Sequence, residues 1–236
     1  MGDRQDKEQY VERLFASIAP RYDLLNSILS FNRHKRWRAF GARECRLSPG
    51  DKAIDVCAGT MDFAIELSKI VGPSGMVLGV DFCRPMLNIG REKLRENDIR
   101  NVEIVEGNAE RLPVASNSFR AATIGFALRN VASVEQTLAE MARVVSPGGR
   151  VVSLELARPA GPVFRRIYSL YFKYGLPLIG GLVNRDRGPY EYLPSSVARF
   201  CSREELCRIM EKIGLVDVHV KDLTSGVVTA HTGTKQ

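Results

Sequence analysis

The sequence has no apolar run long enough to cross a bilayer and no C-x-x-C pair of the kind that metal and redox sites use. Its five cysteines are scattered and odd in number, which indicates free thiols in a reducing cytoplasm and argues against a metal site. The opening MGDRQDKEQYVERL is polar, unlike a signal peptide. We therefore expect a cytoplasmic, globular chain that holds no metal.

Positive charge is plentiful but unevenly placed. The formal net charge is +7. Arginine and lysine concentrate in residues 33–46 and again in residues 158–173, where aromatic residues stand between them. Either cluster alone is explained by a solvated helix face. Together they indicate an anionic partner, which is either a nucleic acid or the surface of a membrane.

Hydrophobic periodicity divides the chain into a helical start, an alternating middle and an insertion. Residues 8–47 have apolar residues at helical spacing, which Pro20 interrupts. Apolar strands then alternate with helices up to residue 157, a rhythm typical of a parallel sheet covered on both faces. An insertion over residues 158–200 precedes a helix and two paired strands. The expected strands are residues 51–59, 75–81, 102–107, 119–128, 150–157, 215–223 and 226–234, and the expected helices are residues 61–72, 85–97, 133–149 (begun by a capping box of Ser133 and Gln136) and 201–214.

Polar residues and glycines follow the first three strands of this alternating region, where open parallel sheets bind their ligands. Gly59 would let a ligand approach the backbone closely. Asp81 can accept hydrogen bonds from both hydroxyls of a ribose, because a carboxylate offers two acceptor oxygens. Asn108 and Ala109 follow the third strand, where they would meet an adenine edge.

Two classes of nucleotide cofactor fit such strand ends. A dinucleotide calls for the pattern G-x-G-x-x-G, but Met61 stands at the place of the second glycine. Asp55 would repel a pyrophosphate, whereas it suits an ammonium group. S-adenosylmethionine combines a ribose, an adenine, an ammonium and a sulfonium without any phosphate. The acidic strand ends therefore favour S-adenosylmethionine.

Several motifs are similar to those of the ubiquinone/menaquinone biosynthesis C-methyltransferase family, and the likeness covers nearly the whole chain. They are FASIAPRYDLLNSILSFNRHKRWR, DVCAGTMD, LGVDFCRPML, GNAERLPVASNSF, TIGFALRNV, RVVSPGGRVVSLE, YSLYFKYGLPLIGGLV and GVVTAHTGTK. The middle motifs are general to class I methyltransferases, whereas APRYDLLN, FALRN and the last motif are specific to the family. The resemblance implies an α/β, Rossmann-like class I S-adenosylmethionine-dependent methyltransferase with a seven-stranded, mostly parallel sheet, helices on both faces, N-terminal helices and a helical insertion after the fifth strand.

The resemblance also implies an organisation and an activity. Residues 1–236 would form a single domain, made of an N-terminal helical lid (1–47), a cofactor-binding core (48–157), an aromatic and basic substrate cover (158–200) and a closing helix with strands (201–236). The activity would be C-methylation of a reduced prenyl quinone. The naphthoquinol of the menaquinone branch is preferred to the benzoquinol precursor of ubiquinone, because the sequence is closer to that branch.

Matching this chain to the family's motifs assigns the cofactor contacts by position. They are Thr60, Asp81, Asn108 and Ala109, with Gly125 beside the cofactor. Two departures stand out: Met61 occupies a position that is usually Gly or Ala, and residues 83–85 replace a turn that usually bears Ser. Neither departure removes a contact that requires a particular side chain.

Arg129, Asn130 and Tyr22 are the candidate catalytic residues. Loss of a proton from the quinol hydroxyl raises the electron density of the neighbouring ring carbon, and a free phenol has a pKa of about 10. A cation such as Arg129, with Asn130 donating beside it, would stabilise the resulting oxyanion. Tyr22 would belong to a lid that excludes water. The alternative is structural, with Arg129 and Asn130 anchoring a loop and Tyr22 packing at a helix end.

The insertion suits the prenyl tail of such a substrate. Its aromatic and apolar residues would line a cleft, and its basic residues would hold the protein peripherally against the inner face of the membrane. A second copy of the chain is a further candidate partner. A methyltransferase acting on another small molecule or on RNA, a nicotinamide oxidoreductase and a catalytically idle binding protein remain alternatives. No nucleic-acid partner is expected, because FALRN stands where an amino-directed nucleic-acid methyltransferase would have the turn D/N-P-P-Y/F. The expected cleft residues are Phe164, Tyr168, Tyr171, Leu176 and Ile179.

Overall fold

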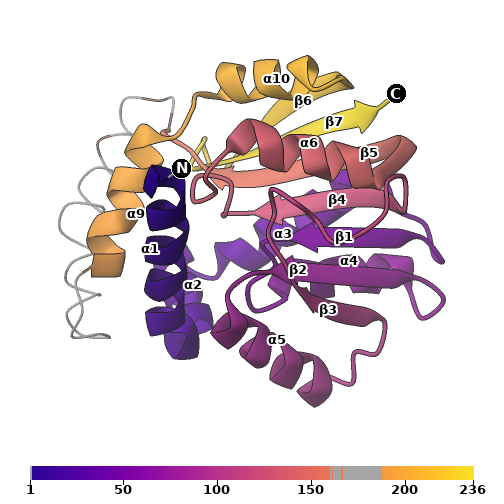
Figure 1. The fold of residues 1–236 in the computed structure, drawn as a ribbon, viewed down its shortest axis with the longest axis horizontal. Helices are drawn as coiled ribbons and strands as arrows, with labels where there is room; N and C mark the ends of the chain where they lie inside the picture. Colours follow the sequence, from indigo (N-terminus) through magenta and orange to yellow (C-terminus); the bar gives the residue numbers. More distant parts are fainter. Residues whose placement is uncertain (1, 160, 162–165, 167–187) are drawn as a thin grey trace.

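The alternating middle of the chain and its closing strands form one sheet in the computed structural model, which describes residues 2–159, 161, 166 and 188–236 (Figure 1). The strand order is β3-β2-β1-β4-β5-β7-β6. All pairs from β3 to β5 are parallel, whereas β7 is antiparallel to both β5 and β6. This is the mostly parallel seven-stranded sheet that was predicted. The strands are β1 (Lys52–Val56), β2 (Met76–Asp81), β3 (Val102–Glu106), β4 (Phe119–Gly125), β5 (Val145–Leu156), β6 (Leu215–Leu223) and β7 (Val228–Lys235).

Helices cover both faces of the sheet, and a separate group stands at the end where β1, β2 and β4 terminate (Figure 1). One apolar cluster joins the sheet to α3, α4 and α5, and another joins it to α6 and α10. The group at the strand ends consists of α1, α2 and α9. The helices are α1 (Gly2–Ile18), α2 (Tyr22–Ser30), α3 (Arg33–Glu44), α4 (Asp62–Val71), α5 (Arg84–Glu96), α6 (Val134–Val144), α9 (Gly188–Arg199) and α10 (Arg203–Lys212), with a 3₁₀ turn, η1 (Ala19–Arg21), between α1 and α2.

One of the two hydrogen bonds of the predicted capping box of α6 forms, and the other is replaced. The Ser133 hydroxyl accepts a hydrogen bond from the Gln136 backbone N–H, as predicted. The Gln136 side chain does not return to Ser133 but donates to the Glu110 carbonyl. The Ser133 N–H donates instead to the Glu110 carboxylate, at 2.6 Å. The start of α6 is thereby tied to the loop that follows β3, one of the loops where the cofactor is expected.

Several predicted boundaries were wrong by a few residues, and two of them bear on the site. The helix expected over residues 133–149 ends at Val144, because Val145 already pairs with Phe119 in the sheet. The strand expected over residues 119–128 ends at Gly125, because Phe126 adopts a left-handed conformation (φ 61°) that turns the chain. The turn at Phe126 sends Arg129 and Asn130 away from the sheet.

Met61 adopts a left-handed conformation (φ 69°) at the residue before α4, a conformation that glycine adopts most readily. Its thioether is fully buried. Gly79 and Gly90 make the room, because a Cβ at either position would come within 3 Å of the Met61 side chain. The loop therefore accommodates methionine by packing it between β2 and α5.

Most of the predicted aromatic cover lies outside the described residues, including all five of the residues expected to line its cleft. Of the insertion, α9 is the helix that the structure describes, and it packs beside α1. Within the described ranges, no helix has the length and apolar character that a membrane span requires.

Candidate functional site

A cavity of about 210 Å³ lies where the carboxyl ends of β1, β2 and β4 meet α1. It brings together the loops after β1, β2, β3 and β4, as expected for a ligand site in an open parallel sheet. Asp55, Thr60 and Arg129 do not line this cavity. The predicted residues that do line it are Gly59, Asp81, Asn108, Ala109, Gly125, Tyr22 and Asn130.

All the charged residues that line the cavity are acidic. Glu8 and Glu12 reach it from α1, Asp81 from the end of β2 and Glu110 from the loop after β3. No lysine or arginine is among the lining residues, which all belong to the described part of the chain. A phosphate group would be repelled by these four carboxylates, whereas a ligand with a positive centre would be attracted.

Asp81 is the central acceptor of the cavity. Its two carboxylate oxygens accept hydrogen bonds from the backbone N–H groups of Gly59 and Cys83, each at 2.8 Å. A carboxylate has about four lone-pair positions, so acceptor capacity remains on the cavity side for the hydroxyls of a ribose. Burial raises the pKa of Asp81 above its usual value, although the two backbone donors act in the opposite direction.

Asn108 and Ala109 meet the cavity from the loop after β3. Ala109 is buried, while Asn108 is exposed. The side-chain oxygen of Asn108 (Oδ1) accepts from the Glu110 N–H at 2.8 Å, and its side-chain NH₂ donates to the Glu8 carboxylate on α1 at 3.3 Å. This short loop therefore contacts the N-terminal helix. On the opposite side, Gly125 has no room for a side chain, since a Cβ there would lie 2.9 Å from the Phe63 ring.

Asp55 does not line the cavity but joins the elements next to it. It is 1% exposed and accepts hydrogen bonds from the Thr123 hydroxyl at 2.8 Å and the Ala64 N–H at 3.1 Å. Burial raises the pKa of Asp55 to about 7. The sequence predicted that Asp55 would meet an ammonium group, and in the structure its carboxylate instead joins β1 to β4 and to the first turn of α4.

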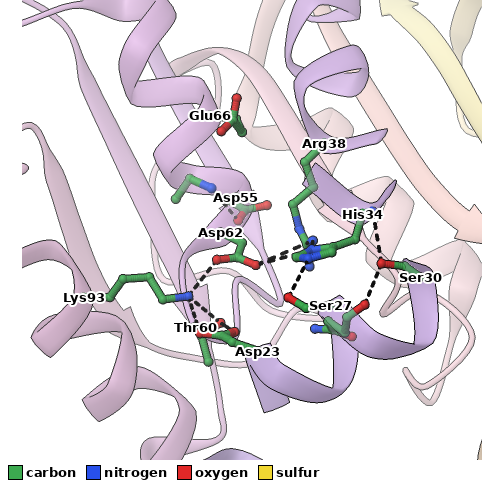
Figure 2. Close-up of polar contacts among 12 residues, drawn as sticks. Asp23, Ser27, Ser30, His34, Arg38, Asp55, Thr60, Asp62, Glu66 and Lys93 are labelled. Carbon is green, nitrogen blue, oxygen red and sulfur yellow. Dashed lines mark hydrogen bonds and ion pairs between the residues drawn. The ribbon is translucent and has the colours of Figure 1, made fainter. Parts of the chain in front are cut away.

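Thr60 lies in a polar cluster that connects the N-terminal helices to the core (Figure 2). Lys93, on α5, is the centre of this cluster. Its ammonium group lies 2.6 Å from Asp23 and 2.6 Å from Asp62, and it also donates to the Thr60 hydroxyl at 3.1 Å. Thr60 in turn donates to Asp23 at 2.6 Å. The loop after β1 is thus joined to the first turn of α2, directly beside Tyr22.

A histidine and an arginine of α3 complete the polar cluster on its other side (Figure 2). The Arg38 guanidinium lies 3.6 Å from the Asp62 carboxylate and donates to His34 Nδ1 at 2.5 Å. Burial and then Arg38 lower the pKa of His34 to about 4, so the ring is neutral at pH 7. Burial alone would raise the pKa of Asp62, but Arg38 and Lys93 bring it below its usual value.

Arg129 forms a buried ion pair behind the cavity wall. Its guanidinium lies 2.5 Å from the Glu155 carboxylate, and the two side chains are 7% and 0% exposed. It also donates to the Phe126 carbonyl at 2.5 Å and to the Ser196 hydroxyl of α9 at 3.3 Å. Its Nη2 atom has no hydrogen-bond partner among the residues that the structure describes. Arg129 therefore holds the loop after β4 against β5 and α9.

Arg129 faces a second groove of about 1030 Å³ between α1, α9 and α10. Val131 and Ala132 line both the groove and the cavity, so a thin wall divides the two. Asn130 stands on the cavity side of this wall, and its amide oxygen accepts a hydrogen bond from the Tyr192 hydroxyl at 3.1 Å. That contact leaves the Asn130 NH₂ group as the end that can donate.

Tyr22 lines the cavity from the start of α2. Burial raises the pKa of Tyr22 above its usual value, and the charge of Arg38 is the main opposing influence. At neutral pH its hydroxyl is therefore protonated and can donate a hydrogen bond. Tyr22 and Asn130 are the two predicted catalytic residues that share the cavity with Asp81.

Sequence reasoning missed three features that matter for this site. Lys93 gave no signal, because a lysine on an amphipathic helix is usually solvated. Glu155 could have been noticed, since it is an acidic residue inside an apolar strand and such a charge needs a partner. The carboxylates of Glu8 and Glu12 reach the cavity only through the position of α1, which no local pattern specifies.

Comparisons with known proteins identify the family of the chain. The model of the ubiE/COQ5 methyltransferase family matches residues 3–235. Demethylmenaquinone methyltransferases of Staphylococcus aureus strains JH9 and Newman are each 44% identical over 236 residues, which is 100% of this chain and 97% of the relative.

Solved structures share the fold at lower identity. A possible histamine N-methyltransferase of Thermotoga maritima, described as S-adenosylmethionine-dependent, is 21% identical with a TM-score of 0.66 and covers 96% of this chain and 100% of its own. An S-adenosylmethionine-dependent methyltransferase of Aquifex aeolicus is 20% identical with a TM-score of 0.62, over 82% of this chain and 87% of its own. The predicted fold class and family are confirmed, and the chain belongs to the ubiE/COQ5 methyltransferase family.

Proposed function

We propose that this methyltransferase converts demethylmenaquinol to menaquinol by transferring the methyl group of S-adenosylmethionine to a ring carbon of the reduced prenyl quinone. The relatives at 44% identity, which match over 97% of their length, bear the name of this activity. The observation that carries the proposal is the acidic cavity at the strand ends, with Asn130 on its wall and no basic lining residue. The cavity suits a cationic nucleoside and disfavours a phosphorylated cofactor.

The cofactor-binding residues take the roles expected from their positions. S-adenosylmethionine, when bound, supplies an electrophilic methyl group on a sulfonium cation. Asp81 accepts the ribose hydroxyls, and the Gly59 backbone allows close approach. Asn108 and Ala109 lie at the adenine, and Gly125 keeps the floor of the cavity open. Asp55 and Thr60 act indirectly, by holding the backbone of the loop after β1.

The quinol ring would lie against the wall that separates the cavity from the second groove. Methyl transfer forms a carbon–carbon bond to the ring, and the hydrogen of that ring carbon leaves as a proton. The Asn130 NH₂ group and the protonated Tyr22 hydroxyl are donors that can stabilise the quinol oxyanion from the cavity side. Arg129 contributes its Nη2 donors from the groove side, while the Glu155 carboxylate offsets much of its positive charge.

A methyl-transfer assay tests the reaction. Purified protein receives methyl-labelled cofactor together with reduced demethylmenaquinol or, in a parallel reaction, the benzoquinol precursor of ubiquinone. We expect label in the naphthoquinol product and less or none in the benzoquinol. Transfer to the benzoquinol alone would change the substrate, and transfer to neither would overturn the proposal.

The organisation of the chain around this reaction belongs to the same proposal. Residues 1–47 act as a lid over the cavity, and residues 158–200 cover the prenyl tail. The contact between α1 and the loop after β3 supports the lid. The protein works in the cytoplasm and meets its substrate at the inner membrane surface, with a second copy of the chain as a further candidate partner.

A further inference from the structure

One face of α2 exposes large apolar side chains to solvent. Leu24 is 54% exposed and Ile28 36%, and their i, i+4 spacing places them on one face of the helix. Phe31, the left-handed residue that follows the last residue of α2 (φ 51°), is 76% exposed. Leu25 is buried beneath them and packs with Ile18 of α1. The helix is therefore held to the protein by one face and presents an apolar face outwards.

Exposed basic residues border this apolar face. Arg33, Lys35 and Arg36 occupy the first turn of α3, directly after Phe31 in the chain. None of the three forms an ion pair with another described residue. Arg38 of the same helix differs, because it is 5% exposed and points to Asp62. The first turn of α3 thus keeps its positive charge at the surface.

We propose that the corner formed by α2 and the first turn of α3 docks on the surface of an anionic lipid bilayer. Leu24, Ile28 and Phe31 enter the boundary between headgroups and acyl chains, and Arg33, Lys35 and Arg36 meet the negative headgroups. Peripheral binding needs two such signals, because a small apolar insertion or a small basic patch is too weak alone. The lipid surface supplies both an apolar layer and negative charge.

Other occupants fit this corner less well. A second copy of the chain in a two-fold arrangement would bring two basic borders of the same sign together. A nucleic acid would meet the basic residues but leave the apolar centre without a partner. A bilayer is the partner that complements the apolar centre and the charged border at once.

The position of this corner gives it a use in the reaction. Tyr22 lines the cofactor cavity from the first residue of the same helix, so the docking face and the cavity share α2. The delivery of a lipid-dissolved prenyl quinol to the cavity rests on the proposed function, whereas the lipid binding itself does not.

Vesicle flotation with the full chain tests the proposal. The vesicles contain phosphatidylcholine alone, or phosphatidylcholine with phosphatidylglycerol. We expect the protein to float with the anionic vesicles and to bind them less tightly as salt is added. The Leu24→Ser/Ile28→Ser variant and the Arg33→Ser/Lys35→Ser/Arg36→Ser variant should each bind about tenfold more weakly or worse.

A matched control removes the same charge elsewhere. Arg91→Ser/Arg95→Ser/Arg100→Ser takes three exposed cations from α5 and the loop after it, and it should bind anionic vesicles like the unmodified protein. Methyl transfer to a short-tailed, water-soluble quinol reports that each variant is folded, and it should be unchanged. If the unmodified protein fails on that quinol but floats with vesicles, the proposed function fails and the docking surface stands.

Three results would overturn the docking surface. The unmodified protein remains unbound to anionic vesicles, or the Leu24→Ser/Ile28→Ser variant floats as well as the unmodified protein. The third is a concentration-dependent dimer in analytical ultracentrifugation that this variant abolishes, which would assign the apolar face to a second copy of the chain.

Discussion

Lys93 lies 2.6 Å from Asp23, an ion pair between α5 in the core and the first turn of α2 in the N-terminal region. The same ammonium group pairs with Asp62, and no local sequence pattern predicts either contact. Since Asp23 follows Tyr22, which lines the cavity, this pair fixes the position of the start of α2 beside the cavity. The N-terminal helices are therefore fastened by a polar contact and not only by apolar packing.

Lys93→Met should loosen the attachment of α2 to the core. Methionine keeps much of the apolar stem but leaves Asp23, Asp62 and Thr60 without their shared donor. We expect a loss of about 1–3 kcal/mol in the free energy of unfolding, because hydrogen bonds to charged groups carry that range. Cofactor affinity, measured by isothermal titration, should fall as well. Lys69→Met is the control, since Lys69 is exposed and, among the residues that the structure describes, its ion pair is with Glu66. An equal effect of both changes would remove the role assigned to Lys93.

Arg129 requires a paired design, because Arg129→Ala alone leaves the buried Glu155 carboxylate without its cation. That change should cost about 3–5 kcal/mol of stability. Arg129→Ala/Glu155→Gln removes both charges and should recover part of that loss. If Arg129 touches the quinol, the double variant is folded and binds cofactor normally, yet its turnover is lower by about 10²–10³-fold. Turnover close to normal in the double variant would show that Arg129 only anchors the loop.

Asp55 should make stability depend on pH. Its pKa is about 7 in the folded protein, against 3.8 as its ordinary value. Between these values the folded state binds more protons than the unfolded state, so this group makes stability fall as pH rises. The buried His34 and His231, each with a pKa lowered to about 4, act in the opposite direction below about pH 6.5.

The measurement for Asp55 is therefore a difference between two proteins. Chemical unfolding of the unmodified chain and of Asp55→Asn is compared at pH 5 and pH 8. Asn can still accept from Ala64 and donate to Thr123, so the packing is retained. We expect Asp55→Asn to gain about 2–3 kcal/mol of stability relative to the unmodified chain on going from pH 5 to pH 8, because only the unmodified chain must release a proton from this buried group. An identical pH dependence of the two proteins would contradict the assignment.

Met61 and Gly90 should show opposite effects when they are changed singly and together. Met61→Gly relieves a left-handed methionine but leaves a hole, with a net loss of about 1–3 kcal/mol. Gly90→Ala should destabilise the unmodified chain, because its Cβ would lie 2.7 Å from the Met61 side chain. In the Met61→Gly background the same alanine fills the hole and improves helix propensity, so it should stabilise.

Thermal unfolding of the four proteins in this cycle provides the check, with cofactor affinity measured alongside. Because Met61 does not line the cavity, the affinity should be unchanged in Met61→Gly. A Gly90→Ala effect of the same sign in both backgrounds would show that the two residues do not share one space.

The fold was largely readable from local patterns. The alternation of apolar strands and amphipathic helices from residue 51 to 157 predicts a parallel sheet, since both faces of each strand must be buried. Ser133 and Pro85 mark helix starts correctly. The Ser133 hydroxyl accepts a hydrogen bond from an otherwise unpaired N–H of the first turn, and Pro85 has no N–H that would need a partner there. Both effects act within a few residues of the chain. The strand end at Gly125 was missed, because the turn at Phe126 depends on its N–H donating to Leu154 of β5.

The candidate site was readable only in part. The residues at strand ends were predicted because parallel strands end at one edge of a sheet, and Gly59, Asp81, Asn108, Ala109 and Gly125 do line one cavity. Asp55 was predicted in the same way, but its side chain is buried and accepts a hydrogen bond from Thr123 of the neighbouring strand β4.

The sequence by itself therefore determined the order of helices and strands along the chain, the acidic strand ends and the family to which the chain belongs. Each of these rests on neighbouring residues or on a motif. Tertiary structure alone decided that Glu8 and Glu12 join Asp81 in one acidic cavity, that Lys93 fastens Asp23, and that Glu155 takes the charge of Arg129. Those contacts join residues far apart in the chain, and their strength comes from burial and charge that exist only once the helices have packed on the sheet.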